Sequence, residues 1–144
     1  MKVVGFTGTR RGMTQEQRTV FMNLMRQLAP TELHHGNCIG SDAEAEAIVD
    51  RYHQDCTIHR HPPLSNVCEN IRTELKIGSL VTHPRKGYLQ RDDDIVKCSE
   101  VIVATPKSTT EEMKGSGTWY TVRQARKMGR KLFIIFPDGS IQEE

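Results

Sequence analysis

The chain has 144 residues, of which 36% are hydrophobic and 26% are charged, and its formal net charge is only +2. This length and composition predict one soluble globular domain over residues 1–144, long enough to bury a core. No stretch approaches the roughly 20 apolar residues of a membrane span, and the small net charge argues against a large nucleic-acid footprint.

The four cysteines, at positions 38, 56, 68 and 98, are widely spaced and form no C-x-x-C pair. This pattern is typical of reduced thiols, so we expect a cytoplasmic protein. The N-terminal residues Met1–Val4 enter an apolar run directly, which predicts that no signal peptide is cleaved.

The first elements expected are a strand and a helix. Residues Lys2–Thr7 form a continuous apolar run, typical of a strand in a sheet that is covered on both faces. A helix follows from about Thr14 to Ala29, with Thr14 and Gln17 as a capping box and Pro30 as its end. Its apolar face comprises Val20, Phe21, Leu24, Met25 and Leu28.

Two short strands with a helix between them come next. The strands are expected over Glu32–His35 and Cys56–Arg60. Ser41 and Glu44 predict a second capping box at the start of the intervening helix. The buried stripe of this helix is expected to comprise Ala45, Ile48, Val49 and Tyr52.

The second half continues the alternation. Residues Asn66–Ile77 are consistent with a helix, and Gly78–Gly87 with a loop that contains one short strand. A helix is expected over Tyr88–Cys98, with Leu89 and Val96 on one face. The remaining elements are a strand over Val101–Thr105, a polar loop, a helix from about Thr118 to Met128 and a strand over Leu132–Phe136. This order predicts an α/β fold, a three-layer sandwich with a mainly parallel sheet.

Three loops that follow predicted strands have the composition of phosphate-binding loops. In the first, Thr7–Arg10, we expect Gly8, Thr9 and Arg10 to contact a phosphate, because glycine permits close approach and arginine binds phosphate through two parallel bonds. The spacing matches neither the dinucleotide fingerprint nor a Walker A loop. A surface turn with solvated arginines is the alternative.

The second loop, Gly36–Asp42, contains two glycines and leads into a helix. We expect Gly36, Gly40, Ser41 and Asp42 to contact phosphate or ribose, since an acidic residue binds ribose hydroxyls in other nucleotide folds. The alternative is that Asp42 only complements the helix dipole and contacts no ligand.

The third loop, Gly115–Tyr120, opens a helix. Backbone amides and a positive helix end favour an anion, so Gly115, Ser116, Gly117 and Thr118 are expected to hold phosphate or ribose. Trp119 or Tyr120 would flank a base. The alternative is a capped glycine loop over a buried tryptophan.

Arg91 is followed by the acidic run Asp92–Asp94. Arginine neutralises phosphate, and a carboxylate beside a sugar acts as a general base or nucleophile, so Arg91 is a candidate ligand contact. Asp42 and Asp92 are the candidate catalytic carboxylates. Three consecutive aspartates cannot share one helix face, so we expect at least two of the run to be solvated.

His59 and His61 lie two residues apart near the end of a predicted strand and would share one face. The sequence has no standard zinc spacing, and His34 and His35 lie on another element. We therefore predict no metal and no cofactor, and expect His61 to contact the ligand.

Taken together, these motifs resemble the SLOG superfamily, which groups the DNA-processing protein Smf/DprA with the "lonely guy" (LOG), lysine-decarboxylase-like proteins. The segments that carry the resemblance are Thr7–Arg10, Gly36–Asp42 with Ala-Glu-Ala after it, Tyr88, Arg91, Ile95 and Val96 before Val101–Pro106, and Gly115–Thr118 with Ala125 and Gly129 downstream. The resemblance implies a Rossmann-like fold, usually homo-oligomeric, that binds nucleotides or nucleotide-derived ligands. Some members cleave the N-glycosidic bond of nucleoside monophosphates.

The chain departs from the LOG enzymes at their catalytic motif, Pro-Gly-Gly-x-Gly-Thr-x-x-Glu, because Thr121 occupies the position of the glutamate. Asp92 stands where related small members often have asparagine. The leading hypothesis is therefore a protein that binds a phosphorylated nucleoside or nucleotide-derived ligand, with signalling nucleotides among the candidates. An N-glycosidase that uses Asp42 or Asp92 is the alternative, and single-stranded DNA binding, by analogy with Smf/DprA, is the weakest.

Overall fold

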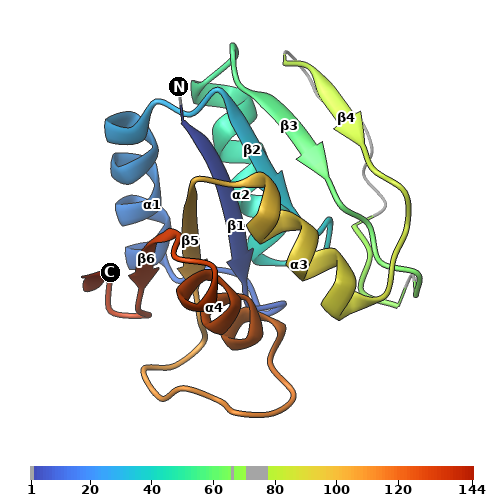
Figure 1. The fold of residues 1–144 in the computed structure, drawn as a ribbon. Helices are drawn as coiled ribbons and strands as arrows, with labels where there is room; N and C mark the ends of the chain where they lie inside the picture. The colour runs from blue at the N-terminus through green and yellow to red at the C-terminus, as the bar shows by residue number, and fades with distance from the viewer. Residues whose placement is uncertain (1, 66, 71–77) are drawn as a thin grey trace.

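The computed structural model describes residues 2–65, 67–70 and 78–144, and within these residues seven strands form one sheet (Figure 1). The strands are β1 (Val3–Gly8), β2 (Glu32–His35), β3 (Thr57–Arg60), β4 (Leu80–Thr82), β5 (Val101–Thr105), β6 (Lys131–Ile135) and β7 (Ile141–Glu143). Their order across the sheet is β4-β3-β2-β1-β5-β6-β7. Neighbouring strands are parallel except β6 and β7, which are antiparallel.

Four helices accompany the sheet in the described residues: α1 (Gln15–Leu28), α2 (Ser41–Tyr52), α3 (Tyr88–Cys98) and α4 (Gly117–Lys127). α1 and α2 cover one face, and α3 and α4 lie on the other (Figure 1). No helix in the described parts of the chain is long and apolar enough to cross a bilayer. The fold is the predicted three-layer α/β sandwich with a mainly parallel sheet.

The core has two parts because successive residues of a strand point to opposite faces of the sheet. In β1, Val4 and Phe6 pack with the apolar faces of α1 and α2. In β5, Ile102 and Ala104 pack with α3 and α4 on the other side. The apolar face expected for α1 is confirmed, with Phe21 fully buried, and Thr14 and Gln17 form the expected capping box.

A charged cluster is buried between α2 and the sheet. Glu46 accepts two hydrogen bonds from Arg60, at 2.8 and 2.7 Å, and lies 2.8 Å from His35 Nε2. His35 Nδ1 accepts from the Asn37 backbone amide, so the Nε2 hydrogen of His35 donates to Glu46. The helical pattern of apolar residues gave no sign of this cluster.

Several expectations for individual residues are wrong. The residue before α2 is Gly40, which has no side chain, so no side-chain cap is present there. Ser41 Oγ instead donates to the Thr9 carbonyl, and Glu44 accepts from the Met13 amide. Tyr52, which was expected to be buried, and Leu89, which was expected to share a helix face with Val96, are each more than half exposed.

The expected short strand within Gly78–Gly87 is present as β4, whereas β7 was not predicted. The helix expected over Asn66–Ile77 lies largely outside the described residues. In its described part, Glu69 forms an isolated antiparallel bridge with Cys38 rather than a helical turn.

Candidate ligand-binding site

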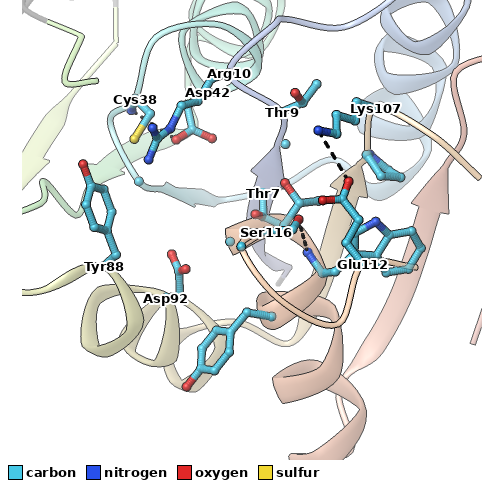
Figure 2. A pocket seen from close by; sticks show the side chains of 18 of the residues that line it. Thr7, Thr9, Arg10, Cys38, Asp42, Tyr88, Asp92, Lys107, Glu112 and Ser116 are labelled. Atoms are coloured by element: carbon cyan, nitrogen blue, oxygen red, sulfur yellow. Dashed lines mark hydrogen bonds and ion pairs between the residues drawn. The ribbon is translucent and has the colours of Figure 1, made fainter. Parts of the chain in front are cut away.

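A pocket of about 690 Å³ lies beyond the carboxyl ends of β1 and β5 (Figure 2). After β1 the chain adds β2, β3 and β4 on one side, and it then places β5 on the other side of β1. Such a reversal of strand order leaves a crevice at the carboxyl ends of the strands, where open α/β sheets bind ligands. Residues from β1, the three glycine loops, α3 and α4 line the pocket.

The first loop is shaped by the start of α2. The Thr9 carbonyl accepts bonds from the backbone amides of Gly12 and Ser41, both at 3.1 Å, and from Ser41 Oγ at 2.7 Å. Gly40 has φ +83°, and a Cβ there would overlap the backbone carbonyl of Arg10. These contacts hold Thr9 and Arg10 at the pocket rather than exposing Gly40 and Ser41 to it.

Gly40 and Ser41, two of the expected ligand contacts, do not line the pocket. Gly8 does line it, but a Cβ at Gly8 would overlap Ser41 Cβ and Thr105 Oγ1. Close packing between β1, β5 and α2 accounts for this glycine without any ligand.

Arg10 extends from the first loop toward the pocket and lies near Tyr88, with its Cζ atom 5.4 Å from the ring centroid (Figure 2). Arg10, Arg11 and Lys114 all line the pocket, and none of them forms an ion pair with a residue that the structure describes. Their charges are thus free to bind an anion.

Arg91 also lines the pocket, but its main contacts are internal. Its Nη1 atom donates to the carbonyl oxygens of Gly36 and His61, and its Nε atom lies 2.8 Å from Asp92 Oδ1. Gly36 has no room for a side chain, because a Cβ would overlap the guanidinium of Arg91. Arg91 therefore connects α3 to the second loop while it remains beside the pocket.

Asp42 and Asp92 approach the pocket from opposite walls, one at the start of α2 and one on α3 (Figure 2). The Asp42 carboxylate accepts a 3.1 Å bond from the Cys38 amide, and burial raises its pKa. Burial raises the pKa of Asp92 to about 7, with the charge of Asp42 adding to the rise and that of Arg91 opposing it. Asp92 is thus able to carry or release a proton near neutral pH.

The other two aspartates of the run are partly exposed to solvent, and each has a side-chain partner. Asp93 accepts 2.9 Å bonds from the hydroxyl of Tyr120 and from the side chain of Gln124, which ties α3 to α4. Asp94 lies 2.6 Å from Lys86 Nζ. Both carboxylates are half-buried.

The third loop forms the N-terminus of α4. Ser116 is its N-cap and accepts a 3.2 Å bond from the Trp119 amide, while Gly115 has φ +77°. The four predicted residues Gly115 to Thr118 all line the pocket. Trp119 also lines it, yet this side chain is only 3% exposed and packs in the core beneath α4, as the alternative for this loop predicted.

The structure brings together most of the predicted site residues. Those that line the pocket are Gly8, Thr9, Arg10, Gly36, Asp42, Arg91, Asp92, Gly115, Ser116, Gly117, Thr118, Trp119 and Tyr120. His61 does not, because its ring packs against other histidines on the far side of the second loop.

Several pocket residues were missed because they come from a loop that had been interpreted only as a connection. Lys107, Glu112 and Lys114 line the pocket from the segment between β5 and α4, and Arg123 holds this segment through the Glu112 carbonyl at 2.9 Å. In the sequence, the basic residues that flank the glycine motif could have indicated that this segment belongs to the pocket. The lining contains six basic residues and three acidic ones, namely Arg10, Arg11, Arg91, Lys107, Lys114 and Arg123 against Asp42, Asp92 and Glu112.

A scan against protein-family models finds no match to this sequence, and a search of curated proteins also finds none. Solved structures do resemble it. The X-ray structure of the structural-genomics target TM1055 superposes with a TM-score of 0.64 at 17% sequence identity, covering 92% of this chain and 72% of the other. At this identity the likeness concerns the fold alone, and the chain has the expected Rossmann-like α/β fold.

Proposed function

We propose that the chain binds a phosphorylated nucleoside or nucleotide-derived ligand in the pocket between α3 and α4. The observation that carries the proposal is the surplus of basic side chains in the pocket lining of a protein whose net charge is only +2. Arg10, Arg11 and Lys114 have no acidic partner among the described residues, so an anionic ligand would supply one.

The phosphate group would lie at the N-terminus of α4. The backbone amides near Ser116 and Gly117 and the positive end of the helix dipole favour a negative charge there. Arg10 would approach the same group from the first loop.

The nucleoside would extend from there toward α3. Asp42 and Asp92 offer carboxylate oxygens to ribose hydroxyls, and the exposed edge of Tyr88 offers an aromatic surface to a base. A volume of about 690 Å³ falls within the range of small-molecule sites.

The same geometry supports membership of the SLOG superfamily. Its first-strand loop, second glycine loop, arginine-bearing helix and terminal glycine motif are matched here by segments that border one pocket. A homo-oligomeric state and a cytoplasmic location belong to the same proposal.

The first test is to denature the purified protein and identify any released ligand by mass spectrometry, and then to measure its affinity by calorimetry. Arg10→Ala should weaken binding at least tenfold, because a charge-assisted hydrogen bond contributes about 1.5–3 kcal/mol. Arg26→Ala is the matched control, since Arg26 is exposed on α1 outside this pocket. Equal affinities for the Arg10 variant and the unmodified protein would remove Arg10 from the site.

Asp92 favours a second candidate function, hydrolysis of the N-glycosidic bond of a nucleoside monophosphate. Its carboxyl faces the pocket with a pKa of about 7, as a general acid or base at neutral pH requires. Thr121, at the position of the LOG glutamate, is fully buried and donates to the Gly117 carbonyl, so Asp92 is the better candidate for the missing carboxylate.

A panel of nucleoside monophosphates, followed by chromatography of free bases, tests this second function. Asp92→Asn should slow base release by about 100-fold or more while the nucleotide still binds, because general acid–base catalysis contributes on the order of 10²–10⁴. The rate of the unmodified protein should show an inflection near the pKa of Asp92. No free base from any nucleotide in the panel would refute the enzyme and leave the binding proposal standing.

A further inference from the structure

Four of the six histidines form one cluster outside the pocket. His34 lies on β2, His59 on β3, and His61 and His83 follow β3 and β4 directly. His34 and His59 are paired across neighbouring strands, so both side chains lie on the α3 side of the sheet. The described residues place no helix over β3 and β4 on this side (Figure 1).

The rings are arranged as two stacked pairs joined edge to edge. His34 stacks on His59 and His61 stacks on His83, each with ring centroids 4.1 Å apart. Between the pairs, His34 Nδ1 lies 2.8 Å from His61 Nε2, and His59 Nδ1 lies 2.9 Å from His83 Nε2. One ring nitrogen of every histidine therefore points to the interior of the cluster.

Glu32 determines which ring nitrogen of His34 carries the hydrogen. Its Oε1 atom lies 2.8 Å from His34 Nε2 and 3.3 Å from His59 Nε2. A carboxylate only accepts hydrogen bonds, so His34 carries its hydrogen on Nε2, and its Nδ1 accepts the Nε2 hydrogen of His61. His59 Nε2 lies beside the same carboxylate without a hydrogen bond to it. A carboxylate that binds the outer nitrogen of a histidine and so orients its inner nitrogen is the usual support of a metal-bound histidine.

We propose that His34, His59, His61 and His83 bind a divalent ion of the zinc class, with Glu32 as the residue that positions His34. Ligand atoms of His34, His59 and His83 already lie within 4.8 Å of one another, whereas His61 meets this limit in a separate group with His34 and Cys98. Each close nitrogen pair is an N–H···N hydrogen bond in the structure. Zinc binds histidine nitrogen at about 2.0–2.1 Å, so the ion would replace these two hydrogen bonds, with the donor histidines carrying their hydrogen on the other ring nitrogen and the rings turned toward the ion.

The chemistry of the cluster selects the ion. Imidazole suits zinc, copper and nickel, whereas magnesium and calcium prefer oxygen ligands. Cys98 lies within the same 4.8 Å limit of His34 and His61, so its thiol is close enough to compete as a ligand.

The proposal does not depend on the proposed function, because none of the four histidines lines the nucleotide pocket. The sequence offered no zinc motif because the four residues come from three separate strands. Their proximity follows from the parallel pairing of β2, β3 and β4.

The test uses the untagged full chain, stripped with a chelator and titrated with zinc chloride by calorimetry and with cobalt chloride by absorption spectroscopy. We expect one ion per chain, and cobalt spectra typical of nitrogen ligands. His59→Gln and His83→Gln should each weaken zinc binding by about tenfold or more, and Glu32→Gln by about 10- to 100-fold. His53→Gln is the matched control, because His53 lies at the end of α2 outside the cluster.

Circular dichroism of the stripped variants shows whether each one folds. At one zinc concentration, zinc should raise the melting temperature of the unmodified protein and of His53→Gln more than that of His83→Gln. Cys98→Ser should retain binding. Absence of saturable zinc binding, or full binding by both His59→Gln and His83→Gln, would overturn the proposal. Loss of binding in Cys98→Ser alone would also overturn the assignment to the four histidines.

Discussion

Glu46 remains ionised although it is buried between α2 and the sheet. Burial opposes the charge, but the hydrogen bonds from Arg60 and His35 outweigh it and lower the pKa of Glu46 from 4.5 to about 2. The pair with Arg60 is bidentate, and the Arg60 side chain is only 2% exposed. Removal of the carboxylate would take this counter-charge away from a buried guanidinium.

Glu46→Gln should therefore lower the free energy of unfolding by about 3–5 kcal/mol, as measured by urea denaturation at pH 7. Because the folded pKa lies below the unfolded one, the stabilisation is complete above about pH 4.5 and is lost as pH falls through about 2. Glu16→Gln, at an exposed position of α1, should change stability by less than about 0.5 kcal/mol. A deficit for Glu46→Gln that stays constant down to pH 2 would contradict this account.

Single polar residues were the hardest to predict. Glu46 and Arg60 occupy positions where a sequence pattern expects solvated charge, and only the packing of α2 against the sheet brings them together. Ser41 has the sequence of a helix cap, yet its hydroxyl binds the Thr9 carbonyl, 32 residues away in the chain. This long-range hydrogen bond takes the place of the local capping bond that the sequence predicted for Ser41.

At the scale of elements, the three glycine loops meet because each leads from the carboxyl end of a parallel strand toward the next helix. The strands β1 and β5 and helix α1 were predictable, since their apolar patterns are long and unambiguous. β7 was not, because its side chains are exposed and give no alternation of apolar and polar residues. The pocket wall between β5 and α4 was missed for a similar reason, as it contains no regular structure.

The second loop depends on a glycine at its first position. A Cβ at Gly36 would overlap the Arg91 guanidinium, whereas a Cβ at Gly87 would have its nearest neighbour at 4.0 Å. Gly36→Ala should lower the free energy of unfolding by about 1–3 kcal/mol through overpacking, and should also weaken ligand binding because Arg91 must move. Gly87→Ala is the control. Equal melting temperatures for the two variants would show that the loop adjusts without strain.

For the whole molecule, the important property is the uneven distribution of charge. The net charge is +2, yet the pocket lining alone has three more basic than acidic residues. Elsewhere many basic side chains are paired, as in the contacts of Arg126 with Glu111 and Glu144. The order of the predicted elements correctly indicated an α/β sandwich, but neither this order nor the bulk composition could show where the unpaired charge gathers.

This distribution predicts a salt-dependent preference for phosphorylated ligands. A mixture of nucleoside monophosphates should raise the melting temperature at about 50 mM sodium chloride more than the corresponding nucleosides do, and the difference should shrink at about 500 mM as the charges are screened. Arg10→Ala should reduce the salt dependence. Equal stabilisation by nucleosides and monophosphates at low salt would show that the basic lining does not select for phosphate.

The described sheet ends in two strands of only three residues each, β4 on one side and β7 on the other. An edge strand carries unpaired backbone amides and carbonyls that can template pairing with another chain, and short edges limit this hazard. β7 also runs against the direction of its neighbours and bears Glu143. Neither border of the described sheet thus offers a long, flat strand on which a second chain could extend it into an aggregate.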